Sequence, residues 1–528
     1  MPRSHECPLP VVQHRQGGYG QGVSDVRVHQ EIERKLEVPA RFRLPDLGEV
    51  SDVGLASPQP TLRLIADYYD TVDLRLARHR ITLRRRTGGG DDGWHLKLPH
   101  ADEATRDEVQ LPLTDDGVPP AELTDLVLGI TRGAALAPVA TLRNERRPTL
   151  VTDRDGVALA EVTDDRVTVV QRGQKTARFR EVEVEAADGR TEADLEPVLA
   201  ALIAAGAAPS HFASKAVRAL GPNAVLPPDI APPAVVTPSD PASAAMIALI
   251  ARHAAAVQAQ DLRVRRQLPD SVHQMRVACR RLRSALKVFG PLFDEAWATH
   301  LRAELKWVGN TLGDARDREV LQSRLLHGVD ELGENDGPRA TAVVHHEMGL
   351  DASEARAKIV GALSSPRYLL LLDALVDAAM APQFTAAALQ PCEVALPPLM
   401  RAAWKRLRRD AKSLQRKGPD DTWHAARIRA KHARYAAEAL APVFGKPASR
   451  LARQLARVTE LLGRHQDAAL TAETARDLAE GNDVDGRAGY VLGLVYRQQR
   501  DEVKAARKEF LHVWPQVAAP RWRRWLRS

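Results

Sequence analysis

The chain has 528 residues, which is too long for one hydrophobic core, and two or three domains are expected. Its formal net charge of +7 is unevenly divided: residues 241–528 carry 46 Lys and Arg against 32 Asp and Glu, whereas residues 1–240 carry 29 against 36. The basic second half favours a polyanionic partner, which is nucleic acid, an anionic membrane or polyphosphate. A membrane span and a secretory signal are not expected, because no stretch approaches roughly 18 to 20 uninterrupted apolar residues and the N-terminus has no suitable apolar run. The three cysteines are far apart and lack ligand spacing, so neither a disulfide framework nor a zinc site is indicated.

Residues 1–27 have no usable period and contain several glycines and prolines, so we expect a disordered leader. From residue 28 to about residue 220 the pattern is mostly that of strands, with period-two alternation and Gly or Asp turns between the runs. A helix is expected near residues 195–205. Residues 221–241 are rich in proline and nearly uncharged, which predicts a stiff linker at a domain boundary.

Several of the predicted strands have a fully charged face. These faces comprise Glu31, Glu33 and Lys35; Thr82, Arg84 and Arg86; His95 and Lys97; Arg106, Glu108 and Gln110; and Glu181, Glu183 and Glu185. A solvated outer face of an antiparallel sheet is the commoner explanation for such a pattern. Here the acids lie on the first and last strands and the bases lie between them, which favours an antiparallel β-barrel with a polar lumen. Its carboxylates would bind Mg²⁺ or Mn²⁺, and its Lys and Arg side chains would hold phosphate oxygens.

After the linker, Ala, Leu and Arg dominate and the period becomes 3.6. The helices of a first unit are expected at about residues 242–267, 271–289, 295–312, 314–332 and 340–361. A proline-containing connection near residues 381–398 leads to a second helical unit over about residues 397–513. Residues 521–528 form a basic tail.

One predicted helix carries a column of cations with no acid among them. The column comprises His273, Arg276, Arg280, Arg283 and Lys287. Like charges at this spacing repel one another, so a long and repeating anion is expected to offset the repulsion. The same steps recur 151 residues later in a second column of His424, Arg427, Lys431 and Arg434. Residues 305–317 are likewise echoed by residues 455–467, which predicts two copies of one unit, over about residues 242–380 and 397–513.

Short motifs in both halves resemble those of known families. ExExK (residues 31–35), YYDT (68–71), LRRR (83–86), LKLP (96–99) and EVEVE (181–185) occur in the order typical of the CYTH family, the triphosphate tunnel metalloenzymes, and residues 28–220 resemble that family. The pattern HxxRVxxRRLRxxLxxF of residues 273–289 resembles the CHAD domain, a helical domain with conserved histidines, and this likeness covers about residues 242–520. The implied fold class is α+β multidomain: an N-terminal antiparallel β-barrel, the triphosphate tunnel, followed by a C-terminal all-α domain of two duplicated helical bundles.

The resemblance to the CYTH family implies two sets of tunnel residues. The divalent cation would be bound by Glu31, Glu33, Glu183 and Glu185. The triphosphate would be held by Lys35, Arg84, Arg86, Lys97, Arg106 and Lys215. A further arginine, Arg143 or Arg146, and a further acid, Asp164 or Asp165, stay open because one residue of register decides each. The resemblance to the CHAD domain assigns the binding of inorganic polyphosphate to the two cationic columns.

The expected function is metal-dependent hydrolysis of inorganic triphosphate or polyphosphate in the tunnel, with the helical domain binding polyphosphate close by. A non-catalytic polyphosphate-binding or targeting protein is the alternative, and thiamine triphosphatase or adenylate cyclase activity is a further one. Nucleic acid is not expected as the main ligand, because buried Trp with solvated Arg explains the basic segments at residues 404–412 and 521–527. A cytoplasmic location is expected, with association with polyphosphate granules. Substrate preference, the choice of Mg²⁺ or Mn²⁺ and the oligomeric state stay open.

Overall fold

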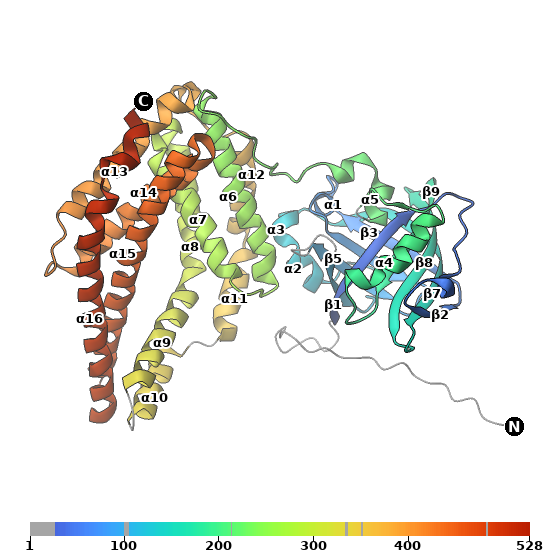
Figure 1. Ribbon diagram of the computed structural model, residues 1–528, viewed down its shortest axis with the longest axis horizontal. Helices are drawn as coiled ribbons and strands as arrows, with labels where there is room; N and C mark the ends of the chain where they lie inside the picture. Colours follow the sequence, from blue (N-terminus) through green and yellow to red (C-terminus); the bar gives the residue numbers. More distant parts are fainter. Residues whose placement is uncertain are drawn as a thin grey trace.

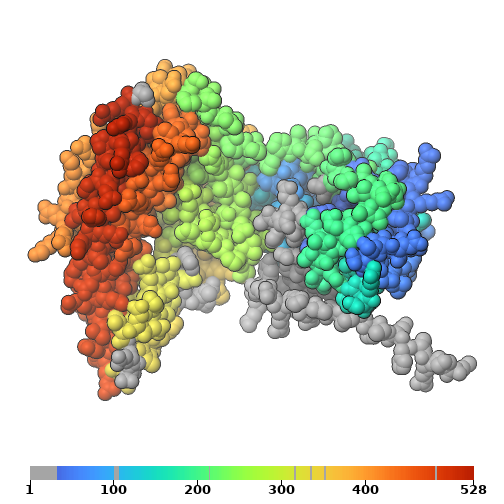
Figure 2. Space-filling model, in the orientation of Figure 1, coloured from blue at the N-terminus to red at the C-terminus, as the bar shows by residue number. Residues whose placement is uncertain are grey.

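The computed structural model describes residues 27–99, 105–212, 214–332, 336–349, 352–481 and 484–527. The expected leader thus lies outside the described residues except for Arg27. A strand-rich domain comes first and a helical domain follows, and a linker runs between them along one side of the molecule (Figure 1). The two domains form separate lobes that touch beneath this linker (Figure 2).

The strand-rich domain contains one antiparallel sheet of ten strands. The strands are β1 (Arg27–Glu37), β2 (Val53–Pro58), β3 (Leu62–Asp70), β4 (Thr82–Thr87), β5 (Gly93–Pro99), β6 (Thr105–Leu111), β7 (Ala137–Asp153), β8 (Ala158–Gln171), β9 (Gln174–Ala186) and β10 (Ala208–Pro209). Their order is β10-β1-β6-β5-β4-β3-β7-β8-β9, and β2 pairs with β7.

Strand β1 joins the two ends of this sheet. Residues 27–32 of β1 pair with β6, whereas residues 33–37 pair with β9. The sheet therefore curves around a lumen, but it is not a fully closed barrel because each half of β1 makes a different pairing. The predicted antiparallel sheet is confirmed, and its closure is less complete than expected.

Alternation along the strands explains why the charged side chains face inward. Leu83 and Leu96 alternate with Arg84 and Lys97, and they pack in a core with Trp94 beneath the short helices α2 (Ala121–Leu126) and α3 (Leu128–Thr131). At the other end of the sheet, helix α4 (Glu192–Ala204) covers the apolar residues of β8 and β9. Since helices bury the outer faces in these regions, the polar faces are left to the lumen. Two further helices complete the domain, α1 (Arg75–Arg78) and α5 (Lys215–Leu220).

The helical domain contains two sets of helices. The first set is α6 (Ala242–Arg265), α7 (Ser271–Val288), α8 (Glu295–Thr311), α9 (Gly313–Leu332), α10 (Gly337–Met348), α11 (Ala352–Leu363) and α12 (Pro366–Met380). The second set is α13 (Cys392–Lys412), α14 (Asp420–Phe444), α15 (Lys446–Ala479) and α16 (Gly486–Val517). One continuous hydrophobic core joins residues of both sets. The predicted all-helical domain is confirmed.

Three regions of the helical domain differ from the predicted elements. The helix predicted over residues 340–361 is two helices, α10 and α11. The last part of the predicted connection, from Cys392, belongs to α13, because burial of Leu396 and Met400 outweighs the local effect of Pro397 and Pro398. Residues 520–527 form a 3₁₀ segment whose Trp side chains pack against the core.

Helix α6 is long and apolar enough to cross a membrane. Among the described residues, no other unbroken helix has the length and hydropathy of a membrane span. Half of its most apolar window is buried inside the protein, where α6 contributes to the helical core. A core helix explains its composition.

The two domains contact each other through buried polar groups. Arg266, at the end of α6, forms an ion pair of 2.6 Å with Asp107 of β6, and both side chains are buried. The neighbouring Arg265 donates to the carbonyl oxygen of Asp125, at 3.1 Å. Because β6 also lines the lumen, this interface lies directly behind the tunnel wall.

Candidate active site and cationic helical surface

The lumen encloses a cavity of about 310 Å³. Its lining is polar and comes from eight of the ten strands, from Asp91 in the turn before β5 and from the start of α5. The predicted residues Glu33, Lys35, Arg84, Arg86, Lys97, Glu183, Glu185 and Lys215 all line it. The structure therefore brings together residues that are up to 182 positions apart in the sequence, Glu33 and Lys215.

Lys215 is the centre of a buried ionic cluster. Ser214 accepts a hydrogen bond from the backbone N–H of Val217 and so caps α5, whose first residue is Lys215. The Lys215 Nζ lies 2.9 Å from Asp165, 2.9 Å from Glu181 and 2.5 Å from Glu183. Arg146 adds bonds of 2.8 to 2.9 Å to Asp165 and one of 3.0 Å to Glu183.

The pKa values in this cluster follow from burial and from these partners. Burial acts to raise the pKa of Glu183, but Lys215, Lys35 and Arg146 bring it well below its ordinary value. Asp165 behaves in the same way, with Lys215 and Arg146 lowering its pKa. For Glu181, burial dominates and the pKa is raised. Burial acts to lower the pKa of Lys215, but the three carboxylates raise it well above the ordinary value.

The opposite wall of the cavity is rich in cations. The register of β4, β5 and β6 places Lys97 opposite Glu108, whose carboxylate accepts a hydrogen bond of 3.1 Å from the buried ring of His95. Burial, together with the nearby Arg84 and Arg146, lowers the pKa of Arg86 to about 9. Arg86 also contacts Asp91, and Arg84 and Lys97 lie 3.6 and 3.9 Å from Glu108. An anion bound beside these neighbouring cations would be stabilised.

A row of three carboxylates provides donors suited to a divalent cation. Glu33 of β1 lies opposite Glu185 of β9, which lies opposite Glu161 of β8, and all three line the cavity. Carboxylate oxygens are the ligands that Mg²⁺ and Mn²⁺ prefer, so the donor chemistry fits such an ion. As placed in the described part of the chain, no three acidic, His or Cys side chains are arranged as a metal site. Lys35 instead contacts Glu33, and the metal ligands stay a prediction.

The structure shows which of the two candidate arginines, and which of the two candidate aspartates, faces the lumen. Arg146 and Asp165 belong to the buried cluster around Lys215. Arg143 and Asp164 lie on the opposite face of the sheet, where Asp164 pairs with Arg180 at 2.7 Å. Period-two alternation allows no other outcome once Arg146 faces the lumen.

Two of the predicted tunnel residues, Arg106 and Glu31, are not among the described residues that line the main cavity. Arg106 lines a small adjoining cavity with Glu33 and Lys97, and it donates to the carbonyl oxygen of Arg80 at 3.1 Å. The backbone of Glu31 pairs with that of Arg106, but its side chain lies outside the described residues.

Sequence reasoning omitted some residues of the site. Glu108 and Glu181 lie on two of the charged strand faces described above. Because Glu108 alternates with Gln110 and Glu181 with Glu183, the period-two pattern could have assigned both to the site. Glu161 stands alone in an apolar strand segment, and only its cross-strand position opposite Glu185 reveals it.

The two cationic columns of the helical domain lie on α7 and α14, which pack against each other. The first arginine of each column has an equivalent acidic partner. Arg276 donates two bonds of 2.8 Å to Asp317, and Arg427 lies 3.8 Å from Asp467. The duplication seen in the sequence is therefore present in side-chain pairing as well.

Positive charge is concentrated where the columns meet. Burial together with Arg427 and Arg280 lowers the pKa of Lys431 to about 7. Burial and the neighbouring cations Arg302, Arg429 and Arg406 also lower the pKa of Lys287. The last three arginines were not predicted, because they lie on helices whose packing the sequence pattern does not reveal.

The remaining column residues make neutral or local contacts. Arg280 donates to the Tyr435 hydroxyl at 3.2 Å, and the His424 ring lies 2.6 Å from Gln466. Arg434 pairs with Glu438 at 2.7 Å, within its own helix. Burial and Arg280 lower the pKa of Arg283. His273 lies apart and lines a separate cavity of about 760 Å³ between α7, α9 and α11.

Both domains match known families, as their motifs predicted. Residues 29–201 match the CYTH domain and residues 248–476 match the CHAD domain. A Mycobacterium tuberculosis (strain CDC 1551 / Oshkosh) protein, named "Uncharacterized protein MT2285", is 34% identical over 512 residues, which cover 91% of this chain and 95% of that protein. The chain belongs to the family of proteins that join a CYTH domain, typical of triphosphate tunnel proteins, to a CHAD domain.

Solved structures are similar to parts of the chain. PptA from Streptomyces chartreusis is 26% identical, covers 52% of this chain and 100% of its own, and has a TM-score of 0.46. The crystal structure of the CHAD domain from the plant Ricinus communis is 26% identical, covers 52% of this chain and 94% of its own, and has a TM-score of 0.41.

Proposed function

We propose that the tunnel hydrolyses inorganic triphosphate or polyphosphate with a divalent cation, and that the helical domain binds polyphosphate. The observation that carries this proposal is the composition of the 310 Å³ cavity, where a row of carboxylates faces a wall of Lys and Arg. Carboxylates bind a hard cation and guanidinium groups bind phosphate, and a phosphoanhydride needs both.

The protein side chains have separate tasks in this reaction. Arg84, Arg86 and Lys97 hold the phosphate oxygens and stabilise charge on them. Glu33, Glu161 and Glu185 would hold Mg²⁺ or Mn²⁺, and a bound ion would stabilise charge on the leaving phosphate and lower the pKa of water. Glu181, whose pKa burial raises, lies 2.9 Å from the Lys215 ammonium group and is suited to exchange a proton with it.

The side chains that line the cavity favour an inorganic substrate over thiamine triphosphate or ATP. Of the described residues that line the cavity, Tyr68 alone is aromatic. Organic rings are usually recognised by stacking or by apolar walls, and neither is prominent in this cavity. A phosphate chain needs only the charged groups that are present.

A non-catalytic polyphosphate-binding protein is the competing proposal. It requires cations, which both domains supply, but it gives no role to Glu33, Glu161 and Glu185 beside a bound anion. Without a counter-ion these carboxylates would repel the ligand. We therefore favour the hydrolase.

Phosphate release tests the proposal directly. Inorganic triphosphate, long-chain polyphosphate, thiamine triphosphate and ATP are compared, each with Mg²⁺ or Mn²⁺. We expect metal-dependent release that is fastest with an inorganic substrate, and the Glu33→Gln/Glu185→Gln variant to lose about 100-fold or more.

The matched control is Glu122→Gln/Glu196→Gln, which makes the same change at two exposed positions. This variant should keep full activity. Polyphosphate binding by the wild-type chain without release from any substrate would establish the non-catalytic alternative.

A further inference from the structure

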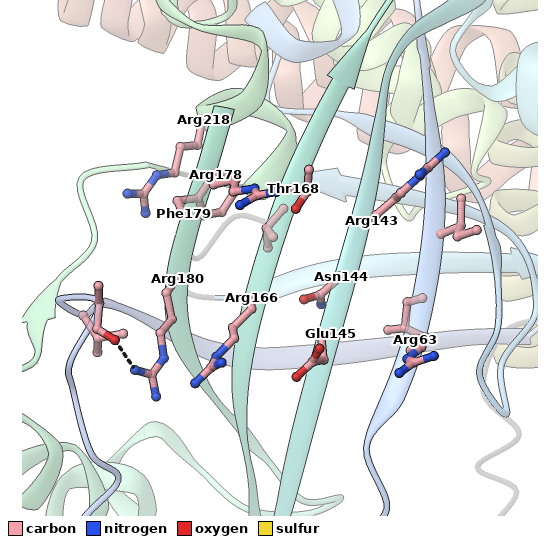
Figure 3. A pocket seen from close by; sticks show the side chains of 15 residues that line it. Arg63, Arg143, Asn144, Glu145, Arg166, Thr168, Arg178, Phe179, Arg180 and Arg218 are labelled. Atoms are coloured by element: carbon pink, nitrogen blue, oxygen red, sulfur yellow. Dashed lines mark hydrogen bonds between the residues drawn. The ribbon is translucent and has the colours of Figure 1, made fainter. Parts of the chain in front are cut away.

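A second concave surface lies on the outside of the sheet, across β3, β7, β8 and β9 (Figure 3). This groove has a volume of about 860 Å³ and is separate from the lumen. Six arginines line it, namely Arg63, Arg143, Arg166, Arg178, Arg180 and Arg218.

Strand register places five of these arginines in two rows. The first row runs from Arg63 through Glu145 and Arg166 to Arg180 on four successive strands. The second row holds Arg143 and Arg178, on either side of Thr168. The intervening residues Leu142 and Val167 are buried, so alternation fixes the direction of the arginines.

The charges of this groove are not balanced within the protein. Arg63, Arg143, Arg166 and Arg178 are exposed, and across the described ranges no acidic side chain pairs with any of the four. Glu145, which lines the groove, pairs with Arg147, and Asp164 on the same face of the sheet pairs with Arg180. A solvated protein face normally mixes both signs, so this excess of guanidinium groups indicates an anionic ligand.

We infer that the groove binds an extended inorganic polyphosphate chain outside the tunnel, and this inference rests on the proposed function. Guanidinium groups bind phosphate oxygens in pairs. A row across four strands spans about 14 Å at the usual strand spacing, which suits a run of several phosphates better than a single one.

The same lining argues against single-stranded nucleic acid. Phe179 is the one aromatic side chain among the described lining residues, and Arg218 lies over its ring at 4.3 Å. Nucleic acid that is held without sequence preference needs open aromatic rings for base stacking. A ligand made only of phosphate has no such requirement.

Helix α5 connects the groove to the tunnel. It carries Lys215 into the lumen cluster and Arg218, one turn later, to the edge of the groove. Polyphosphate held in the groove would therefore stay close to the tunnel domain, which raises its local concentration there.

The test measures binding of fluorescently labelled long-chain polyphosphate to the full chain. The background variant Arg280→Gln/Arg427→Gln/Lys431→Gln weakens polyphosphate binding by the helical domain, so that the contribution of the groove to the measured affinity can be resolved. In this background, Arg143→Gln/Arg166→Gln/Arg178→Gln is compared with Arg154→Gln/Lys446→Gln/Arg450→Gln, which removes the same charge at exposed positions outside the groove. We expect the groove variant to bind about tenfold more weakly than this control, and to hydrolyse inorganic triphosphate at the wild-type rate.

Each other outcome overturns a defined part of the inference. Equal affinities of the groove and control variants, with hydrolysis intact, would show that the groove is only a solvated face. Equal competition by single-stranded DNA of matched charge would show that the groove is not selective for polyphosphate. If the wild-type chain neither hydrolyses triphosphate nor binds polyphosphate, the proposed function fails and the inference fails with it.

Discussion

Lys215 neutralises more buried charge than any other tunnel residue described above. Three carboxylates lie within 2.9 Å of its ammonium group, and it reaches them from the first residue of α5. Its removal would leave like charges facing one another in a desolvated site. Lys215 therefore stabilises the fold, apart from any role in binding phosphate.

We expect Lys215→Met to lower the free energy of unfolding by about 3 to 5 kcal/mol, because a buried ionic cluster loses its central partner. Urea denaturation at neutral pH measures this change. Lys175→Met, at an exposed position of β9, is the matched control and should cost less than about 0.5 kcal/mol. Similar losses in both variants would mean that the cluster rearranges around other cations.

Lys431 would make the proposed binding of polyphosphate dependent on pH. Its pKa of about 7 lies below the ordinary value of 10.5, so the Lys431 side chain is mostly a neutral amine above pH 7 and mostly a charged ammonium group below. A bound polyanion favours the charged form, so binding takes up a proton. We expect the affinity to rise as the pH falls from 8.5 to 7, by up to about tenfold per unit, and then to level off.

Lys431→Arg keeps the charge and should remove this part of the pH dependence. His273 and His424 are present in both proteins, so the difference between the two pH profiles isolates Lys431. Titration calorimetry in buffers of different ionisation enthalpy also counts the protons taken up. Identical profiles for both proteins would contradict the assignment.

At this scale the sequence predicts which strand faces are charged but not how their charges pair. Period-two alternation was sufficient for Glu33, Lys35, Arg84 and Arg86, which all face the lumen. It did not decide between Arg143 and Arg146, since a single bulge reverses the answer. Glu161 was not predicted, because its partner Glu185 lies on another strand and cross-strand neighbours depend on the register of the sheet.

At the scale of elements, the repeat of α7 and α14 extends to the helices that follow them. Asp317 on α9 and Asp467 on α15 are equivalent positions, and each pairs with the first arginine of its column. These acids compete with any anion for Arg276 and Arg427. They would therefore weaken the binding of a polyanion to the cationic surface.

We expect Asp317→Asn/Asp467→Asn to tighten polyphosphate binding by about three- to tenfold, because two exposed ion pairs no longer compete with the ligand. Equilibrium binding at two salt concentrations measures the effect. Asp330→Asn/Asp421→Asn removes the same charge from exposed sites and controls for net charge. An equal gain in the control would show that only the overall field changed.

Periodicity predicts most helices of this domain, and it fails where tertiary packing decides. Gly349 separates α10 from α11, although the apolar pattern runs on through both. Pro397 and Pro398 would normally end a helix, yet α13 contains them because its buried face continues on both sides. Neither outcome follows from local sequence alone.

At the scale of the whole molecule, the buried pair of Arg266 and Asp107 fixes the helical domain against β6. Glu108, the next residue of β6, belongs to the cationic wall of the cavity. The domain interface and the candidate active site therefore share one strand. Sequence alone divides the chain at its linker and by its charge, but it does not reveal which surfaces of the two domains meet.

A double-mutant cycle tests this connection. We expect Asp107→Asn and Arg266→Met each to destabilise the chain by about 3 kcal/mol, and the double variant to cost clearly less than the sum. Chemical denaturation followed by near-ultraviolet circular dichroism provides the free energies. The exposed pair Arg497 and Asp501 serves as the control cycle, with a coupling below about 1 kcal/mol.

The double pairing of β1 has a consequence for the order in which the protein folds. Glu33 is paired with Glu185, so β1 must wait for β9, one of the last strands of its domain. Contacts so distant in sequence form slowly, because a long loop must close before they contribute. During that interval the edges of β1 stay open to incorrect pairing. A nascent chain that is halted before β9 should therefore aggregate readily, and folding should become robust only after α5 has been synthesised.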